Sequence, residues 1–451
     1  MRLGGRLQAA IDVLSDVDKR KRPVSEALKA WGLDHRFAGS GDRAAIGNIV
    51  YDCLRKKSST QYLMGSDSIR RLVFGTLLRD WGYDGQSLNA ALEGDKFAPE
   101  LLSEQEIAEF EKRDLGAAPP HIQADIPEWL SSSLQANFAE DWIAEAQAFT
   151  QRPPVDLRIN TLKSNQDKVA KALQKTGAKA SEIARNGLRI APGQGVSRQP
   201  NVQAEAAFQK GWFEIQDEGS QIVADLVYAR PGEQVLDFCA GAGGKTLAMA
   251  ASMENRGQIH AYDTDKNRLK PIYERLKRAG IRNAQVHGPD DDMSELVGKM
   301  DRVVVDAPCT GTGTWRRHPH AKWKLTREML EMRLTEQDEA LSESAPFVKP
   351  GGYLIYITCS ILPEENENQI TSFIEDNPQF ELLSVGEVWQ DLFGFDKPQP
   401  WSSDMKTVTL TPASVNTDGF FFAVVGTQAA AETQGRYSGQ ICYPDTFCIG
   451  C

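Results

Sequence analysis

The sequence predicts a mixed α/β protein in three parts, and three observations lead to this prediction. Apolar residues recur at helical spacing over residues 1–140, and the pattern then changes to a small α+β module over 141–230. Over residues 231–426, apolar strands alternate regularly with helical segments, as in a doubly wound, mostly parallel sheet. At 451 residues, the chain also exceeds the size at which one hydrophobic core stops growing.

The first part contains three segments with clear helical spacing. Leu7, Ile11 and Leu14 mark one of them, and residues 46–54, which include Cys53 as a packing residue, mark the second. Residues 70–78 mark the third. We expect this part to be all helical.

The second and third parts alternate strands with helices. In the second part we expect strands at 155–160, 187–191 and 212–216, and helices over 166–175 and 219–228. In the third part we expect strands at 235–238, 258–262, 285–287, 303–306, 353–358 and 420–425. The tail over 427–451 has little apolar periodicity, and we expect it to be disordered.

Composition bounds the class of protein. Seven cysteines spread along the chain are not a secreted disulfide framework, which favours a reducing cytosol. No apolar run is long enough to span a bilayer, and the first residues lack the apolar core of a signal peptide. The net charge is −11, but residues 1–80 carry a balance of +6 and residues 81–150 one of −11. Charge therefore neither supports nor excludes a nucleic-acid partner.

A glycine-rich loop follows the first strand of the third part. Its residues are Cys239, Ala240, Gly241, Ala242, Gly243, Gly244 and Lys245. The spacing matches neither the dinucleotide fingerprint nor a P-loop. The second strand ends in Asp263, which is well placed to accept hydrogen bonds from ribose hydroxyls. The loop alone is as typical of a tight turn, but together with this acid it favours S-adenosylmethionine over NAD.

Two cysteines stand in short motifs at the ends of apolar runs. Cys309 closes Asp306-Ala307-Pro308-Cys309, and Cys359 is the centre of Thr358-Cys359-Ser360. Free cysteines usually pack, but these two lie at strand ends where a packing residue has little to bury against. Carbon 5 of cytosine is too weak a nucleophile to attack a methyl donor unaided, and a thiolate that adds to carbon 6 activates it. Two thiols, a carboxylate and a cofactor loop fit this chemistry.

These motifs resemble the RsmB/Nop/Sun family of RNA cytosine-C5 methyltransferases. The matching segments are 239–246, 306–313, 316–319, 358–367 and 418–421, with weaker matches at 157–160 and 216–221. The resemblance implies a class I S-adenosylmethionine-dependent methyltransferase fold, with a mostly parallel, seven-stranded sheet whose last strand, 420–425, is antiparallel. More loosely, the first part resembles the NusB-like helical domain of bacterial members.

The resemblance also implies roles for single residues. Cys359 would be the nucleophile, Cys309 would assist release of the product, and Asp306 would hydrogen-bond the cytosine edge near N3. The cofactor contacts would come from the loop 239–245, Asp263, Asp306 and an acid after the third strand. The sequence departs from the family pattern at this last position, where Asp290, Asp291 and Asp292 follow one another. We take Asp290 as the cofactor contact and Asp291 as the second choice.

The resemblance implies RNA contacts as well. Arg158 and Asn160 match an RNA-contacting segment of the second part. Arg55, Lys56 and Lys57 would add phosphate contacts from the first part. Trp315 could stack on a base or pack beneath the site.

Several alternatives stay open. DNA cytosine methyltransferases place the nucleophile in the Pro-Cys motif and lack the second cysteine, so the thiol pair favours RNA. A free-base methyltransferase, a non-catalytic RNA-binding assembly factor and an NAD-dependent oxidoreductase are further alternatives. Ribosomal RNA is favoured over transfer RNA. We expect a cytoplasmic monomer with no membrane contact. We also expect no metal, because three thiols in the tail (Cys442, Cys448 and Cys451) are too few for a structural zinc site.

Overall fold

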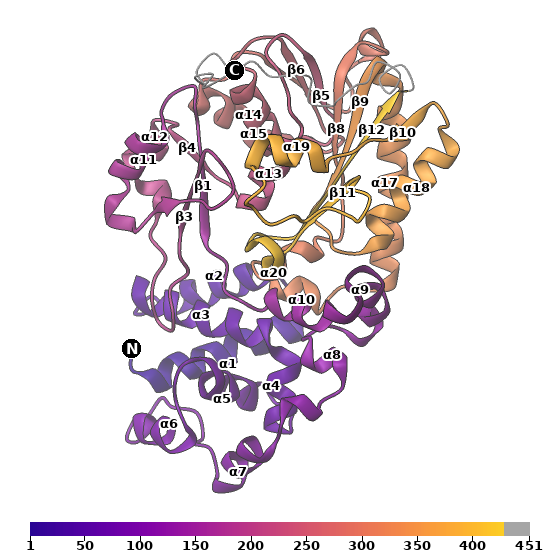
Figure 1. Ribbon diagram of the computed structural model, residues 1–451. Coiled ribbons are helices and arrows are strands. Elements are labelled where there is room, and N and C mark those ends of the chain that lie inside the picture. Colours follow the sequence, from indigo (N-terminus) through magenta and orange to yellow (C-terminus); the bar gives the residue numbers. More distant parts are fainter. Residues whose placement is uncertain (428–451) are drawn as a thin grey trace.

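The computed structural model describes residues 1–427 in three parts that contact one another (Figure 1). In Figure 1 the helical part lies at the bottom, a small antiparallel module lies at the left, and the large sheet lies at the upper right. The predicted tail, with its three cysteines, lies outside the described residues except for Thr427.

Seven helices form the helical part, which we define as residues 1–112. They are α1 (Leu3–Arg20), α2 (Val24–Asp34), α3 (Ser40–Arg55), α4 (Lys57–Met64), α5 (Ile69–Asp80), α6 (Gly85–Leu92) and α7 (Glu104–Lys112). The predicted helical segments correspond to α1, α3 and α5. Their apolar stripes meet in one core in which Leu7, Ile46, Cys53 and Phe74 are fully buried. The packing role predicted for Cys53 is confirmed.

Three short helices connect the helical part to the rest. They are α8 (Pro120–Gln123), α9 (Ser131–Phe138) and α10 (Trp142–Ala148). Leu134 and Trp142 pack in one cluster with Trp315, Ile361 and Leu362, which all belong to the large sheet domain. The predicted boundary between the first and second parts, at residue 140, remains a proposal. The packing of Leu134 and Trp142 places α9 and α10 against the sheet domain.

The module is a four-stranded antiparallel sheet with strand order β2-β3-β1-β4. Its elements are β1 (Val155–Ile159), α11 (Gln166–Ala172), β2 (Lys179–Ala180), β3 (Gly187–Ile190), α12 (Ala206–Gln209) and β4 (Phe213–Ile215). The three predicted strands are confirmed. β2 was not expected, because it has only two residues and both are exposed.

The sheet domain, residues 218–427, contains eight strands in one sheet. They are β5 (Gln234–Asp237), β6 (Gln258–Tyr262), β7 (Ala284–His287), β8 (Met300–Asp306), β9 (Val348–Thr358), β10 (Phe380–Leu382), β11 (Thr407–Leu410) and β12 (Phe420–Thr427). The order is β10-β12-β9-β8-β5-β6-β7, and β11 also pairs with β12. The seven strands of this order and the antiparallel pairing of β12 with β9 confirm the predicted fold, to which β11 adds a short eighth strand.

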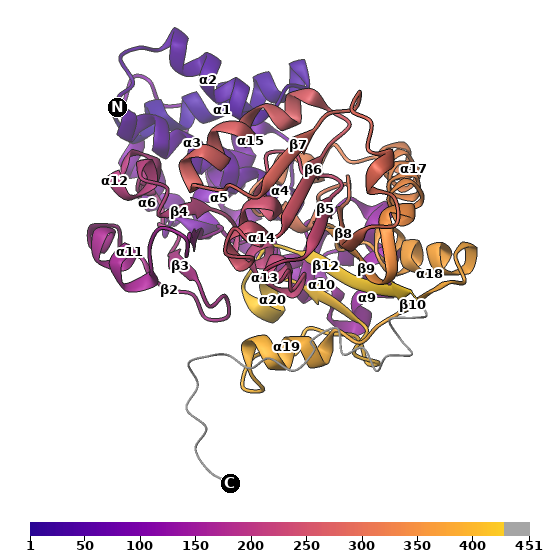
Figure 2. The same ribbon diagram turned by 90° about the horizontal axis from the view of Figure 1, so that it is seen from above.

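Helices cover both faces of this sheet (Figure 2). On one face lie α13 (Glu218–Leu226), α14 (Gly244–Ser252) and α15 (Lys266–Ala279), and on the other lie α17 (Arg327–Ser344) and α18 (Glu367–Asp376). Alternate strand residues fill the two layers: Val304 and Ile355 face the first, and Val303 and Leu354 face the second. The remaining helices are α16 (Pro319–Lys322), α19 (Gly386–Phe393) and α20 (Pro412–Val415).

The end of α3 is bound to the sheet domain by buried polar contacts. The Asp52 carboxylate accepts hydrogen bonds from Arg55 at 2.9 Å, from Arg152 at 2.9 and 2.5 Å, and from Trp81 at 3.0 Å. Arg55 also donates to the carbonyl of Arg316 at 2.9 Å. Arg55 is only 7% exposed, so the phosphate contact predicted for it is wrong. Its guanidinium instead joins the helical part to the sheet domain.

The two neighbouring lysines are also engaged within the protein. Lys56 pairs with Asp80 at 2.5 Å, and the Lys57 ammonium lies 5.7 Å from the centre of the Trp323 ring. Trp323 in turn donates to the carbonyl of Leu54 at 2.7 Å. Arg55 and Lys57 therefore belong to the interface between the two parts, whereas Lys56 pairs within the helical part.

Asp52→Ala should lower the free energy of unfolding by about 3–5 kcal/mol, because it leaves the buried guanidinium of Arg55 and the half-buried one of Arg152 without their carboxylate. Urea unfolding followed by circular dichroism measures this change. Asp80→Ala is the matched control, since its ion pair with Lys56 is more exposed and contributes about 0–1 kcal/mol. Equal losses in the two variants would contradict the role given to Asp52.

Candidate active site

The carboxyl ends of four parallel strands bring the sequence motifs together at one edge of the sheet. β5 leads into the glycine-rich loop, β6 ends at Tyr262 just before Asp263, β8 ends at Asp306 and β9 ends at Thr358. β8 and β9 are neighbours, with Asp306 opposite Ile357. The loops that carry Cys309 and Cys359 therefore start side by side.

The two thiols lie in contact. The Sγ atoms of Cys309 and Cys359 are 3.3 Å apart, and both side chains are partly accessible. The hydrogen bond with Cys359, together with burial, raises the pKa of the Cys309 thiol well above its usual value. Cys309 therefore keeps its proton and can donate it toward Cys359.

Hydrogen bonds lock the two cysteine loops together. Gly313 donates to the carbonyl of Cys359 at 2.9 Å, and the hydroxyls of Thr312 and Ser360 are 3.0 Å apart. Thr312 also accepts the main-chain N–H of Ile361 at 2.9 Å. Because these contacts cross from one loop to the other, the distance between the thiols is set by the main chain.

Glu365 is a buried carboxyl group that the sequence analysis did not identify. It accepts hydrogen bonds from the main-chain N–H of Thr310 at 2.8 Å, from the Thr310 hydroxyl at 2.5 Å and from Gln337 at 3.0 Å. Burial raises its pKa. Glu365 holds Thr310, the residue next to Cys309. Its place within segment 358–367, which resembles the family, is the feature of the sequence that could have identified it.

Lys245 connects the glycine-rich loop to the carboxylate at the end of β8. Its ammonium lies 2.8 Å from Asp306 and 5.3 Å from the centre of the Phe420 ring. Lys245 is almost fully buried, whereas the Asp306 side chain is 31% exposed. The ion pair therefore fixes Asp306 and leaves part of its carboxylate accessible beside the thiols.

The glycine-rich loop is held against the end of β6. Gly241 donates its main-chain N–H to Asp263 at 3.0 Å, and Asp265 donates to the other oxygen of Asp263 at 2.9 Å. Gly243 has φ +81°, and a Cβ there would lie 2.5 Å from Ile272. Only glycine allows this turn to approach α15 so closely.

Asp237, the last residue of β5, is a buried acid below this loop. One of its oxygens accepts the Thr246 hydroxyl at 2.6 Å, while the other has no partner among the described residues. Burial raises the pKa of this carboxyl to about 7. The sequence analysis did not single out Asp237.

Asp290 and Asp291 lie away from the thiols, after β7. Asp290 is exposed and pairs with Lys266, and Asp291 accepts the main-chain N–H of Gly288 at 2.8 Å. Both follow the strand next to β6, so either can face a ligand bound at the Asp263 loop. The choice of Asp290 stays a prediction.

Arg158 and Asn160 lie at the junction of the module and the sheet domain. Arg158 is buried and donates to Gln216 at 2.6 Å. Asn160 donates to the carbonyls of Gly211 and Ala279, both at 2.8 Å. RNA contact by either residue stays a prediction, and the observed bonds of Asn160 tie the module to α15.

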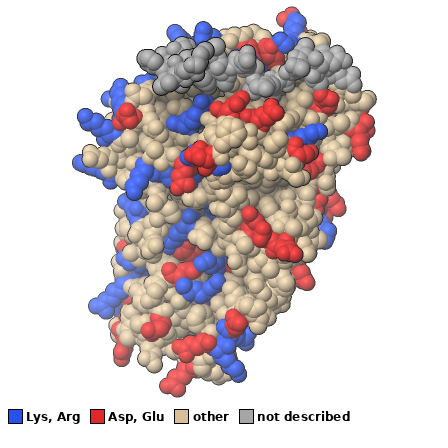
Figure 3. Space-filling view, in the orientation of Figure 1, with Lys and Arg blue, Asp and Glu red and all other residues tan. Residues whose placement is uncertain are grey.

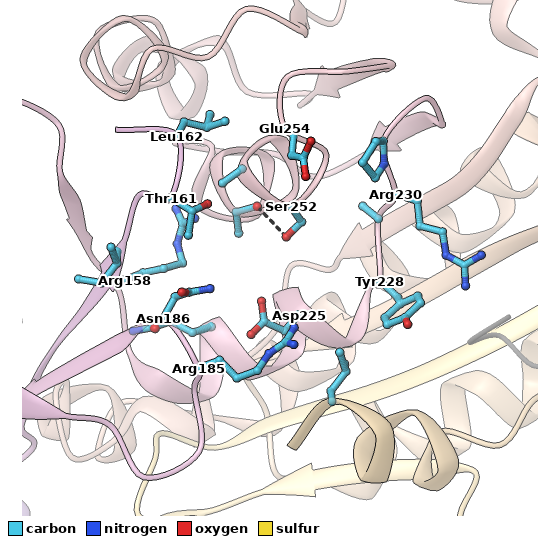
Figure 4. A pocket seen from close by; sticks show the side chains of 17 residues that line it. Arg158, Thr161, Leu162, Arg185, Asn186, Asp225, Tyr228, Arg230, Ser252 and Glu254 are labelled. Atoms are coloured by element: carbon cyan, nitrogen blue, oxygen red, sulfur yellow. Dashed lines mark hydrogen bonds between the residues drawn. The ribbon is translucent and has the colours of Figure 1, made fainter. Parts of the chain in front are cut away.

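Figure 4 shows a cavity of about 1030 Å³ beside Arg158. It is bordered by the second half of α13 with Asp225, by the end of α14 with Ser252, and by Arg185. None of the loop or thiol residues lines it. This cavity is therefore separate from the candidate active site.

Trp315 packs beneath the active site. It is 1% exposed and contacts Phe149 edge-on, with ring centres 6.4 Å apart. Of the two roles considered for Trp315, the structure supports packing.

The strand order and the motifs at the edge of the sheet define a class I S-adenosylmethionine-dependent methyltransferase fold. A model described as 16S rRNA methyltransferase RsmB/F matches residues 224–425, and a model of its ferredoxin-like domain matches residues 126–197. Ribosomal RNA small subunit methyltransferase B of Shigella flexneri is 34% identical over 325 residues, which are 71% of this chain and 69% of that protein. The chain therefore belongs to the RsmB/F methyltransferase family.

One further relative and one solved structure are similar to this chain. The protein of the same name from Citrobacter koseri is 34% identical over 66% of this chain, and the chain spans 65% of that relative's length. A solved structure described as PH0851 covers 94% of this chain and 99% of its own, with a TM-score of 0.70 and 23% identity. This last likeness concerns the fold.

Among residues 1–427, no helix is long and apolar enough to cross a membrane. Within the same residues, no group of three or more His, Cys, Asp or Glu side chains is arranged to hold a metal ion.

Asp237→Asn should change how stability depends on pH. The carboxyl keeps its proton up to about pH 7 when folded, against a usual pKa of 3.8, so the folded state binds more protons between these values. The stability of the native protein should therefore fall as pH rises from about 4 to 7, on the order of a few kcal/mol relative to the variant. Urea unfolding of both proteins across this range measures the difference, and a difference independent of pH would contradict the burial of a protonated Asp237.

Proposed function

We propose that this protein transfers a methyl group from S-adenosylmethionine to carbon 5 of a cytosine in small-subunit ribosomal RNA. The contact between the Cys309 and Cys359 thiols, 3.3 Å apart, carries the proposal. A thiol pair at adjacent strand ends beside a carboxylate matches a reaction that needs one group to attack carbon 6 and another to assist release. The names of the relatives from Shigella flexneri and Citrobacter koseri support ribosomal RNA as the substrate.

The residues at the sheet edge fit S-adenosylmethionine. Asp263 is fixed by two main-chain N–H groups, and its carboxylate suits ribose hydroxyls. The turn has Gly241 and Gly243 in the left-handed region, and Gly243 lets the loop pack closely against α15 beside Asp263. Asp263 and Asp306 also add negative charge near a cofactor that carries a sulfonium and an ammonium group. When bound, S-adenosylmethionine supplies the electrophilic methyl group.

In the proposed mechanism, the Cys359 thiolate donates an electron pair to carbon 6 of the cytosine. The electrons of the C5–C6 double bond shift through carbon 4 to N3, which takes up a proton from water, and Asp306 accepts the hydrogen bond of this N3–H and so stabilises the intermediate. Lys245 orients Asp306 during this step. Carbon 5 is then nucleophilic and takes the methyl group.

Release of the product breaks the bond between Cys359 and carbon 6. Transfer of the proton on carbon 5 to a water molecule restores the C5–C6 double bond and expels Cys359 as a thiolate. Cys309 lies in contact with that sulfur, and its raised pKa suits a group that exchanges a proton there. Glu365 holds the Cys309 loop in place for this step through its hydrogen bonds with Thr310. We therefore assign attack to Cys359 and release to Cys309.

Two other functions are distinguished by experiment. A non-catalytic assembly factor would bind RNA without forming an adduct. A transfer RNA methyltransferase would form one with tRNA but not with small-subunit rRNA. Bisulfite mapping of RNA from cells with and without the protein identifies the modified cytosine.

Cys359→Ala should abolish methyl transfer and every covalent adduct, because carbon 6 loses its nucleophile. Cys309→Ala should still attack and methylate but fail to release, so that a denaturant-resistant protein–RNA complex accumulates. Denaturing gel electrophoresis with labelled rRNA and cofactor measures both outcomes.

Cys53→Ala, which removes a buried thiol of the helical part, is the control and should release product normally. Accumulation of the adduct in Cys359→Ala would show that the two roles are exchanged. No adduct in any variant would favour the assembly factor.

Asp263→Ala should weaken S-adenosylmethionine binding by about 1–3 kcal/mol, the scale for hydrogen bonds to a charged group. RNA affinity should change little, because Asp263 is buried below the loop and away from the thiols. Calorimetry with the cofactor and filter binding with rRNA measure the two affinities. Equal losses in both would mean that Asp263 supports only the fold of the loop.

A further inference from the structure

Positive charge is concentrated where the module meets α15. The segments there are residues 160–171 and 205–214 of the module and residues 266–282, which contain α15. Together they hold eleven Lys and Arg against four acids, so that their balance is +7; the acids are Asp167, Glu205, Glu214 and Glu274. The whole chain has a net charge of −11, and the helical part has a balance of zero.

Contacts join these segments into one surface. Asn160 donates to the carbonyl of Ala279 at 2.8 Å. The Lys163 ammonium donates to the carbonyls of Arg278 at 2.5 Å and Lys210 at 3.4 Å, so it links all three segments. Figure 3, in the orientation of Figure 1, shows Lys and Arg side chains gathered over the left edge, where the module lies. We call this surface, formed by residues 160–171, 205–214 and 266–282, the basic surface.

The outer face of α15 is basic and carries an aromatic ring. Lys270, Tyr273 and Lys277 are spaced by three and four residues, so they share one face of the helix. All three are exposed, and Tyr273 is 60% exposed. The opposite face packs on the sheet domain through four buried residues: Leu269, Ile272, Leu276 and Ala279. The basic face of α15 is therefore directed to solvent.

Most cations of the basic surface are not neutralised by an acid. Four of the eleven form ion pairs: Arg275 and Arg278 with Glu214, Lys266 with Asp290, and Arg268 with Asp263. Within residues 1–427, the other seven have no acid at ion-pairing distance: Lys163, Lys168, Lys171, Lys210, Lys270, Lys277 and Arg282. Exposed cations without an acid beside them attract anions from solution.

Two of these ammonium groups are held in place by one ring. Lys168 Nζ lies 4.2 Å from the centre of the Trp212 ring, and Lys210 Nζ lies 5.1 Å from it. A cation over an aromatic face keeps its full charge but loses part of its freedom. The two groups are therefore ordered before an anion binds, which lowers the entropy cost of binding.

The basic surface adjoins the cofactor loop. Arg275 donates to the carbonyl of Ala242, which belongs to the glycine-rich loop, at 2.6 Å. α15 begins at Lys266, three residues after Asp263. A polyanion on the basic surface therefore lies beside the edge of the sheet that carries the thiols.

We propose that the basic surface binds the phosphate backbone of the RNA substrate. The inference rests on the proposed function. Lysine ammonium groups act as point charges, which suits contacts with phosphates that carry no sequence information. Charges interleaved with an exposed ring, as at Lys270, Tyr273 and Lys277, are typical of surfaces that hold single-stranded nucleic acid. These contacts hold the strand while the target cytosine reaches Cys359.

The double variant Lys270→Gln and Lys277→Gln in the full-length protein removes two of these charges. The slope of log affinity for small-subunit rRNA against log salt should become shallower by about 1–2, because each phosphate contact contributes about 0.7–0.9. At low salt, the affinity should fall about ten-fold to a hundred-fold. Filter binding at several salt concentrations measures both quantities. Lys19→Gln with Lys29→Gln is the matched control, because these two lysines are exposed, form no ion pair within residues 1–427 and belong to the helical part.

The outcomes separate this inference from the proposed function. Equal salt slopes in the two double variants would overturn the inference, since both proteins have the same net charge and differ only in where charge was removed. Lys270→Arg with Lys277→Arg should keep the wild-type slope, and a shallower slope there would overturn the inference too. The affinity for S-adenosylmethionine, measured by calorimetry, should be equal in all these proteins, which shows that each is folded. A wild-type protein that binds rRNA with a steep salt dependence but transfers no methyl group would overturn the proposed function alone.

Discussion

A buried network of two arginines and two aspartates holds the active-site loop in place. Arg316 is 1% exposed, pairs with Asp418 and donates to Asp217 at 3.2 Å, and Arg317 pairs with the same two carboxylates. Asp217 caps the start of α13, and Asp418 precedes β12. Arg55 reaches the carbonyl of Arg316 from the helical part. Removing one member of such a network leaves an uncompensated buried charge, so its members keep one arrangement.

The position of the thiols follows from this constraint. Arg316 stands seven residues after Cys309 in the same loop, and Gly419 donates to the carbonyl of Gly313 at 2.7 Å. The loop is therefore fixed at both ends: β8 holds its start, and the network holds its end. Glu365 fixes the middle from the Cys359 side. A sulfur contact set by so many main-chain bonds is suited to a reaction in which one sulfur attacks and the other assists departure.

The sequence predicted the features that depend on local pattern. The strands from β5 to β9 and the place of Asp306, Cys309 and Cys359 at strand ends followed from apolar runs, whereas the antiparallel direction of β12 followed from the family resemblance. β10 and β11 escaped prediction because strands of three or four residues are defined by their partner rather than by their own pattern. Arg55 was misread because its partners, a carboxylate within the same helix and a carbonyl 261 residues away, leave no mark on the local sequence.

The central claim is that Cys359 bonds to carbon 6 of the target cytosine. It is tested most directly with the wild-type protein, S-adenosylmethionine and small-subunit rRNA in which 5-fluorocytidine replaces cytidine, since fluorine at carbon 5 cannot leave as a proton does. Digestion of the trapped complex and mass spectrometry identify the modified peptide. The account predicts a nucleotide on the peptide that contains Cys359. A nucleotide on the Cys309 peptide, or no trapped complex at all, would contradict it.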